Sequence, residues 1–178
     1  MLTKRAFAPI VLSPQDVERW PDSSVIQAST TAWRRSQALS IHLPATDRSV
    51  PICRDLARLW LDEQQLADQD TGHTALLVIT ELTTNAIVHT DSTVIAASLR
   101  RSRTHLRVQV RDQGRLSTGE HWHNTSGFGR GLGIVASCTQ ALGTHVADDG
   151  TRAIWATLPL KEAVRDTPRR SPEHHHAT

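Results

Sequence analysis

The sequence predicts an α+β fold: a two-layer sandwich in which one mixed, mostly antiparallel sheet has helices packed on one face. Three observations support this prediction. Segments 49–66 and 70–90 place apolar residues at helical spacing. Segments 92–101 and 104–112 instead alternate apolar and polar residues, as the two strands of an antiparallel hairpin do. A third apolar helix, 132–142, precedes two short strands around an Asp-Gly turn, and helices combined with hairpins indicate the α+β class.

The domain is expected to begin with a strand at 36–44. The two helices that follow have suitable capping residues, Ser49 for the first and Asp70 or Thr71 for the second. Gly143 is expected to stop the third helix. The apolar stripe that should pack on the sheet is clearest in the second helix, where it comprises Ala75, Val78, Ile79, Leu82 and Ala86.

The two ends of the chain differ in character from the predicted domain at 36–160. Residues 1–35 contain much Ser, Thr, Asp and Pro and no sustained periodicity, so we expect a poorly ordered extension. Residues 161–178 have a similar composition and are expected to form a disordered tail. The organisation predicted from the sequence is therefore one domain with an extension at each end.

The charge balance gives no reason to expect nucleic acid or an anionic membrane as a partner. The chain has 20 Lys and Arg against 18 Asp and Glu, a formal net charge of +2. No apolar run reaches the roughly 18 residues needed to span a bilayer, and the N-terminus lacks the core of a signal peptide. The sequence therefore predicts a cytoplasmic protein.

Three polar residues, Glu81, Asn85 and His89, follow one another at intervals of four in the second predicted helix. Residues four apart differ by about 40° around a helix, so the three form one slanting row beside the apolar stripe. An amide oxygen in such a row can bind Mg²⁺, and a carboxylate one turn away can accept a proton. A solvated helix face is the alternative interpretation of the same row.

Three later stretches could form the other walls of a binding site. Asp112 closes a strand, and Gly114 after it would let the backbone turn close to a ligand. Thr151 follows an Asp-Gly turn and could place a hydroxyl at the floor of the same site. Before the third helix, where N–H groups and the helix dipole favour a phosphate chain, glycines alternate at Gly127, Gly129, Gly131 and Gly133. Taken singly, these stretches also fit a strand-ending turn, a hairpin and a mobile hinge.

The joint order of these motifs resembles that of the GHKL (histidine kinase-like) ATPase superfamily. Glu-x-x-x-Asn on a helix, Asp-x-Gly at a strand end, Gly-x-Gly-x-Gly opening a helix and Gly-Thr entering the last strand span about residues 37–160. The stretches "ITELTTNAIVHT", "GRGLGIV" and "DDGTRAIWATLPL" are most similar to stand-alone anti-sigma-factor serine/threonine kinases of actinobacterial type. The resemblance implies the histidine kinase-like ATPase fold.

The resemblance also implies a role for each matching residue. Glu81 would be the catalytic base, and Asn85 would hold Mg²⁺. Asp112 would accept a hydrogen bond from the adenine amino group, with Gly114 shaping that end of the pocket. The family's phosphate-contacting glycines and the threonine of its last motif correspond to Gly129, Gly131, Gly133 and Thr151. In one departure from the family pattern, Leu116 replaces the second glycine after Asp-x-Gly, so that loop is expected to be stiffer or shifted.

The function implied by the resemblance is transfer of the γ-phosphoryl group from Mg-ATP to a serine or threonine of a partner protein. ATP and Mg²⁺ would be the cofactors. The partner would be a sigma factor or an anti-sigma antagonist protein, and the resemblance also implies a homodimer.

Three other functions fit parts of the same sequence. A nucleotide-dependent binding module would use ATP only to set its shape and would transfer no phosphate. A split histidine kinase would need a two-helix dimerisation unit, and the polar segment before residue 36, broken by proline, is too short for one. A metal protein would use His121 and His123, which have no cysteine or acid at ligand spacing nearby.

Overall fold

The computed structural model describes residues 8–31, 33, 36–114, 130–147 and 149–160. The N-terminal part of this chain forms β1 (Ile10–Val11), α1 (Pro14–Arg19) and α2 (Ser23–Thr31). The predicted domain then forms β2 (Ala38–Pro44), α3 (Ser49–Glu63), α4 (Asp70–Val88), β3 (Val94–Arg101), β4 (His105–Asp112), α5 (Arg130–Cys138), β5 (Ala141–Val146) and β6 (Arg152–Pro159).

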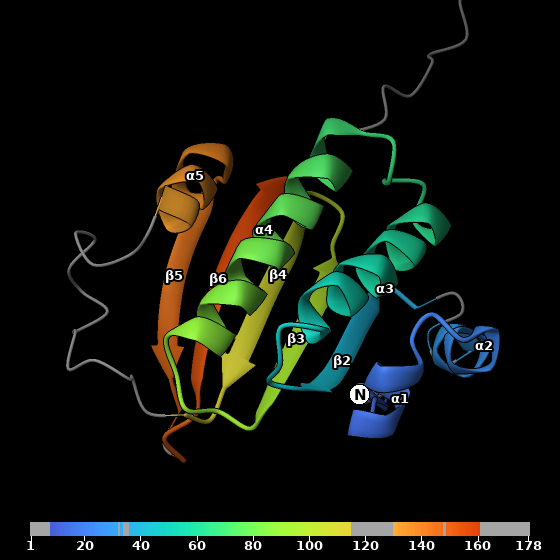
Figure 1. Ribbon diagram of the computed structural model, residues 1–178. Helices are drawn as coiled ribbons and strands as arrows, with labels where there is room; N and C mark the ends of the chain where they lie inside the picture. Colours follow the sequence, from blue (N-terminus) through green and yellow to red (C-terminus); the bar gives the residue numbers. More distant parts are fainter. Residues whose placement is uncertain (1–7, 32, 34–35, 115–129, 148, 161–178) are drawn as a thin grey trace, which may run out of the picture.

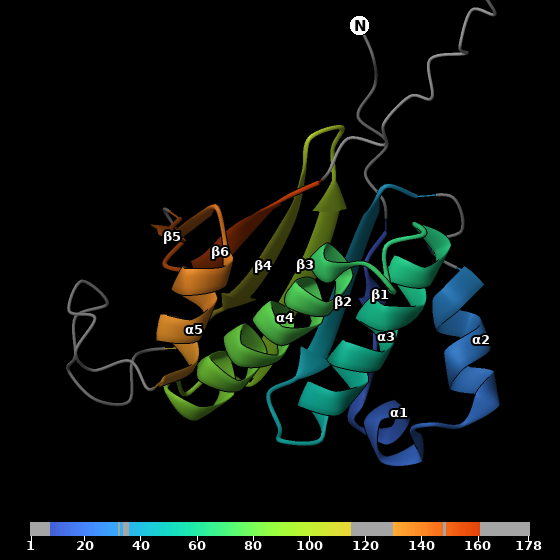
Figure 2. The same cartoon turned by 90° about the horizontal axis from the view of Figure 1, so that it is seen from above.

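The strands form one mixed sheet in the order β1-β2-β3-β4-β6-β5. β1 is parallel to β2, and every other neighbouring pair is antiparallel. Helices α3, α4 and α5 lie on one face of this sheet (Figures 1 and 2). The predicted α+β two-layer sandwich is therefore confirmed, including the order of its elements after residue 36.

The core lies between this helical layer and the sheet. In β4, Leu106, Val108 and Val110 are buried toward the helices, while the residues between them point to the other side. The predicted apolar stripe of α4, from Ala75 to Ala86, is buried against the sheet. Removing this apolar surface from water is the main stabilising contribution to the fold, and it fixes which side of α4 faces inward.

Residues 8–31 differ from the poorly ordered extension expected there, because they form β1, α1 and α2. Ser13 caps α1: its hydroxyl accepts a hydrogen bond from the Asp16 backbone N–H at 3.2 Å, and the Asp16 carboxylate accepts one from the Ser13 N–H at 2.9 Å. Val17 and Val25 are buried from these helices. Glu18 also forms an ion pair of 2.8 Å with Arg48, at the start of α3. Residues 1–7 and the predicted tail at 161–178 lie outside the described residues.

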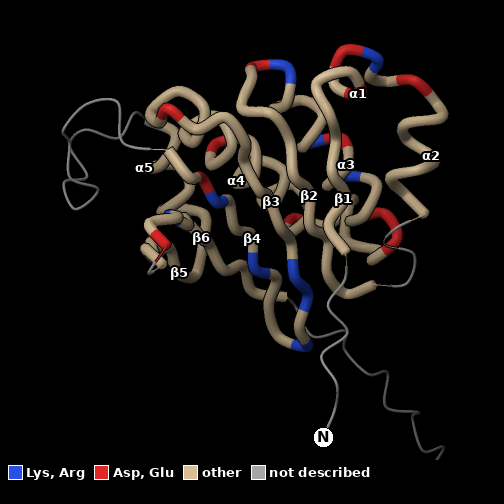
Figure 3. The backbone as a smooth tube through the Cα atoms, turned by 90° about the horizontal axis from the view of Figure 1, so that it is seen from below, with Lys and Arg blue, Asp and Glu red and all other residues tan. Residues whose placement is uncertain are grey.

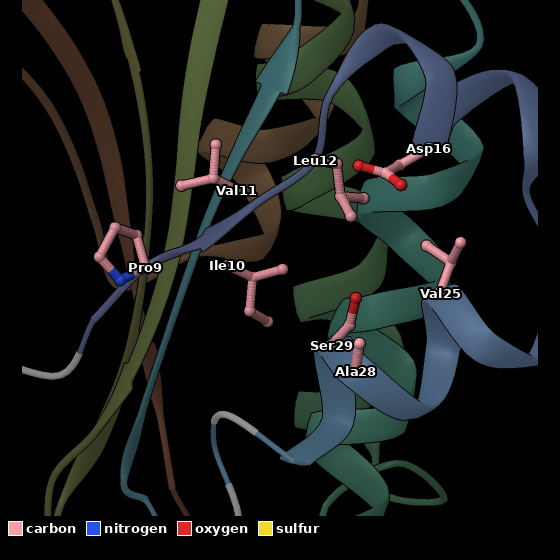
Figure 4. Close-up of a pocket in the computed structure, with 8 residues that line it drawn as sticks. All are labelled: Pro9, Ile10, Val11, Leu12, Asp16, Val25, Ala28 and Ser29. Atoms are coloured by element: carbon pink, nitrogen blue, oxygen red, sulfur yellow. The ribbon is translucent and has the colours of Figure 1, made fainter.

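A pocket separates β1 from α2 (Figure 4). Ile10 and Leu12 point into it from β1 and the residue after it, and Val11 points the other way. Val25, Ala28 and Ser29 line it from α2, with Pro9 and Asp16 completing the wall. None of the predicted site residues lines this pocket.

The third predicted helix is shorter than expected. α5 ends at Cys138, and the last two residues of the predicted helix, Ala141 and Leu142, belong to β5 instead. Gly143 does not stop a helix but lies within β5, opposite Trp155 of β6. A Cβ at Gly143 would lie 2.7 Å from Cε2 of the indole, so the strand requires glycine for this close approach.

The predicted caps of α3 and α4 were wrong in detail. The Ser49 hydroxyl donates to the Pro44 carbonyl at 2.6 Å, and the Thr71 hydroxyl donates to the Pro159 carbonyl at 3.1 Å. Both side chains therefore tie a helix to a neighbouring strand end instead of capping the helix. No helix in the described part of the chain has both the length and the apolar character needed to cross a membrane.

Candidate functional site

Helix α4 carries the two residues with the clearest chemistry, Glu81 and Asn85, one turn apart. Asn85 is only 9% exposed, and its Nδ2 has no hydrogen-bond partner among the described residues. The same side-chain amide carries an oxygen, a type of atom that hard cations such as Mg²⁺ prefer. Leaving a buried polar group unpaired costs free energy. Asn85 is therefore suited to contact a ligand.

Helix α5 brings Gly131 against Glu81. A Cβ at Gly131 would overlap a carboxylate oxygen of Glu81 and would lie 2.9 Å from its Cδ. The Glu81 carboxylate would have to move to admit a side chain at this position, whereas a Cβ at Gly133 would meet nothing within 4 Å. The first turn of α5, whose backbone N–H groups have no partners within the helix, thus lies next to the acid of α4.

A hydrogen-bonded relay connects the end of α4 to the turn after β4. The Thr90 hydroxyl donates to the Ala86 carbonyl at 2.5 Å, and the Ser92 N–H donates to the Thr90 hydroxyl at 3.3 Å. The Ser92 hydroxyl then accepts from the N–H groups of Gln113 and Gly114, at 2.9 and 2.6 Å. The relay fixes the Asp112–Gly114 turn relative to the helix that carries Asn85.

Gly114 is needed at this turn for a steric reason. A Cβ there would overlap the backbone nitrogen of Ser92 and would lie 2.7 Å from Oδ1 of Asp91. Glycine therefore lets the chain after β4 pack directly on the connection between α4 and β3.

Asp112 is a buried carboxylate at the end of β4, 3% exposed. Its Oδ1 has no hydrogen-bond partner among the described residues and lies 3.7 Å from Nη2 of Arg152. Arg152 stands directly opposite on β6, and its Nη2 also donates to the Gly114 carbonyl. Burial raises the pKa of Asp112, while the positive charge of Arg152 acts in the opposite direction.

Thr151 immediately precedes Arg152 in the chain, but its side chain hydrogen-bonds to a residue other than Asp112. The Thr151 hydroxyl donates to the Asp149 carboxylate at 2.6 Å, within the turn between β5 and β6. The structure thus brings Arg152 to Asp112, and it ties Thr151 to the turn. His89 ends α4, where its backbone N–H donates to the Asn85 carbonyl at 3.0 Å.

Several predicted positions lie outside the described residues. They are Leu116, His121, His123, Gly127 and Gly129.

Arg152, Thr90 and Ser92 were missed by the reasoning from sequence. Thr90 and Ser92 act through the turn that follows α4, and no motif marks them. Arg152 could have been found from the strand pairing: once β4 and β6 are aligned, it stands opposite Asp112.

Residues 43–157 match the family model described as the histidine kinase-like ATPase domain. The chain belongs to this family. The histidine kinase-like ATPase match runs from the end of β2 into β6, so it contains Glu81, Asn85, Asp112 and Gly131 and leaves β1, α1 and α2 outside. The predicted superfamily is thereby confirmed.

A comparison with solved structures found a protein whose fold is similar to the fold of this chain. The crystal structure of the RsbU and RsbW domains of Rv1364c from Mycobacterium tuberculosis is similar over 68% of this chain, with 24% sequence identity and a TM-score of 0.50. This similarity concerns the fold alone, and it spans only 32% of that longer chain. None of the curated proteins compared with this histidine kinase-like ATPase matches it.

Proposed function

We propose that this chain binds Mg-ATP and transfers the γ-phosphoryl group to a serine or threonine hydroxyl of a partner protein. The observation that carries the proposal is the contact between Gly131 and Glu81. It sets the first turn of α5, a favourable place for phosphate groups, beside a carboxylate that can accept a proton. An unpaired amide, Asn85, lies one helical turn further along α4.

The residues present fit a magnesium ion held together with a nucleotide. Among the described residues, no three His, Cys, Asp or Glu side chains are grouped closely enough to hold a metal by themselves. The side-chain amide of the buried Asn85 includes one oxygen that could bind the ion, and Mg²⁺ is commonly held by one or two protein ligands plus substrate phosphates. Asn85 would hold the ion, which would neutralise charge on the phosphate chain when bound.

The chain's own groups would then position the reaction. Glu81 would accept the proton of the partner's hydroxyl while that oxygen bonds to the γ-phosphorus and the bond to the bridging oxygen breaks, leaving ADP. The first turn of α5 would hold the phosphate chain through its backbone N–H groups. Most of the rate enhancement would come from positioning and electrostatics.

Asp112 would read the base at the other end of the site. Its buried Oδ1 lacks a hydrogen-bond donor, which an exocyclic amino group could supply. The relay through Thr90 and Ser92 would keep this carboxylate at a fixed place relative to Asn85.

The partner would be an anti-sigma antagonist protein, with a sigma factor as the second binding partner, in the cytoplasm. The similarity of the motifs around Glu81, Gly131 and Thr151 to stand-alone anti-sigma-factor kinases supports this choice. The chain would then act as an anti-sigma factor whose kinase activity controls which partner it holds, and it would work as a homodimer.

The proposal is tested by phosphoryl transfer from labelled Mg-ATP to a candidate anti-sigma antagonist. We expect Glu81→Gln to slow transfer about a hundredfold or more, because general base catalysis contributes 10²–10⁴-fold. Asn85→Ala should weaken magnesium-dependent ATP binding, whereas Glu63→Gln, at the exposed end of α3, should behave as wild type. Wild-type transfer rates in both site variants would contradict the assignment, and ATP binding without transfer to any partner would select a binding module.

A further inference from the structure

The face of the sheet opposite α3, α4 and α5 is not covered by any described helix (Figure 2). Its residues on β3 and β4 include Arg100, Arg107 and Arg111, which alternate with the buried residues of these strands. Basic residues gather along the two strands and the turn between them (Figure 3). We call Arg100, Arg107 and Arg111 the arginine face.

Two members of the arginine face stand directly opposite each other. Arg100 on β3 pairs in register with Arg107 on β4. Like charges at such a position destabilise an antiparallel pair. No described ion pair involves any of the three arginines, and no described strand residue on this side of the sheet is Asp or Glu. One carboxylate near this side, the exposed Asp149 in the turn between β5 and β6, interacts electrostatically with Arg111. The fold therefore gains little from this charge.

Trp155, the tryptophan beside the arginine face, already has contacts within the protein. The Arg107 guanidinium lies 4.2 Å from the ring centroid of Trp155, and the backbone of β5 at Gly143 packs against the same ring. Sequence-independent binding of single-stranded nucleic acid relies on free aromatic rings on which bases stack. Because Trp155 is the aromatic residue on this side among the described strands and its ring is contacted in this way, nucleic acid is the weaker candidate.

We propose that the arginine face docks an acidic segment of a partner protein. The guanidinium fork matches carboxylates in geometry as well as charge. Arg107 and Arg111 are four residues apart on one strand, a span of about 13 Å that several carboxylates of one peptide can cover. A second copy of this chain fits this face poorly, since the same side of its sheet offers no Asp or Glu among the described strand residues.

This docking surface is separate from the proposed nucleotide site. Asp112 faces the helices from β4, whereas Arg111 beside it points to the opposite side. Binding of an acidic segment to the arginine face therefore does not depend on ATP binding.

The test uses the full chain and a fluorescein-labelled peptide of alternating glutamate and alanine, followed by fluorescence anisotropy at low ionic strength. Arg100→Ser/Arg111→Ser should weaken binding roughly threefold to tenfold, as expected for the loss of two exposed ion pairs. The matched control, Arg54→Ser/Arg58→Ser, removes the same charge from exposed positions of α3 and should bind as wild type.

Folding and ligand class are controlled in the same experiment. Both variants leave the contact between Arg107 and Trp155 intact, and Arg100→Ser should unfold at no lower temperature than wild type because it removes the opposed charge. An oligothymidine of the same net charge is titrated in parallel. The proposal is overturned if the wild type does not bind the peptide, if both double variants weaken it equally, or if the oligothymidine binds more tightly through the same arginines.

Discussion

Asp112 and Arg152 show how much one buried carboxylate depends on its neighbour. Asp112 is almost fully buried, and burial raises its pKa because the charged form loses its hydration. Arg152, on the next strand, opposes this rise, and it also donates to the carbonyl of Gly114. The pair therefore shapes the base end of the proposed site from two strands at once.

We expect Arg152→Ala to destabilise the protein by roughly 1–3 kcal/mol, because it leaves a buried charge uncompensated. Burial already raises the pKa of Asp112 in the folded state. The stability that its protonated form contributes is therefore fully present below the unfolded pKa of about 3.9, and it is lost as pH rises through the folded pKa. Removing Arg152 raises that pKa further, so Arg152→Ala should lower the free energy of unfolding more at neutral pH than near pH 4.

Urea unfolding at the two pH values, followed by tryptophan fluorescence, measures this difference. Arg152→Lys retains the charge and should recover part of the stability at neutral pH. An equal loss for Arg152→Ala at both pH values would show that Arg152 does not act through the charge of Asp112.

Sequence patterns found the acids and the amide of the candidate site but not the residues that hold them. Glu81, Asn85 and Asp112 belong to motifs with fixed spacing along one helix or strand. Arg152 and Ser92 act across elements, through strand register and a turn that only the folded chain brings together. Contacts of this kind leave no periodic signal in the sequence.

At the scale of elements, α1 is the clearest case of local sequence determining structure. Ser13 and Asp16 form a reciprocal capping box, and Pro14 occupies the first turn. The box begins a helix of only six residues, which packs Val17 into the core. The side-chain hydrogen bond with Ser13 is also the main reason why the pKa of Asp16 is lowered.

We expect Ser13→Ala to lower the free energy of unfolding by about 1 kcal/mol, the usual cost of losing an N-cap. Because the pKa of Asp16 is lowered in the folded state, its contribution is present above the unfolded pKa of about 3.9 and is lost as pH falls through the folded value. Urea denaturation of Ser13→Ala and of the exposed control Gln15→Ala, at neutral pH, measures the effect. If both variants are as stable as wild type, α1 is not held by this cap.

Long periodic elements were predictable, and short ones were not. α3, α4, β3 and β4 each repeat their pattern over eight residues or more, so helical or strand periodicity identifies them. β1 and α1 are too short for a repeat to show, and α2, although nine residues long, is mostly Ser, Thr, Gln and Ala without sustained apolar periodicity. The Ser-x-x-Asp capping box of α1 was a local signal that the reasoning from sequence did not use. Gly143 was wrongly predicted to stop a helix, because its role depends on a contact with Trp155 of the neighbouring strand.

At the scale of the whole molecule, the two faces of one sheet carry different proposed tasks. The helical side holds Glu81, Asn85 and Asp112, which come from α4 and β4, and α5 adds Gly131. The uncovered side carries the arginine face. A partner could therefore be held on one side of the sheet while nucleotide occupies the other.

The central claim is that α4 and α5 meet to form one phosphate-binding end of a Mg-ATP site. A calorimetric titration of Mg-ATP into wild type, Gly131→Ala and Gly133→Ala tests it most directly. We expect wild type to bind and Gly133→Ala to stay close to wild type. We expect Gly131→Ala to bind at least about tenfold more weakly, a difference of about 1.4 kcal/mol. The reason is that a Cβ at Gly131 would displace the Glu81 carboxylate from its place beside the first turn of α5, whereas a Cβ at Gly133 would meet nothing within 4 Å. Equal affinities of wild type and Gly131→Ala, or no binding by wild type, would show that α4 and α5 do not form this phosphate-binding end.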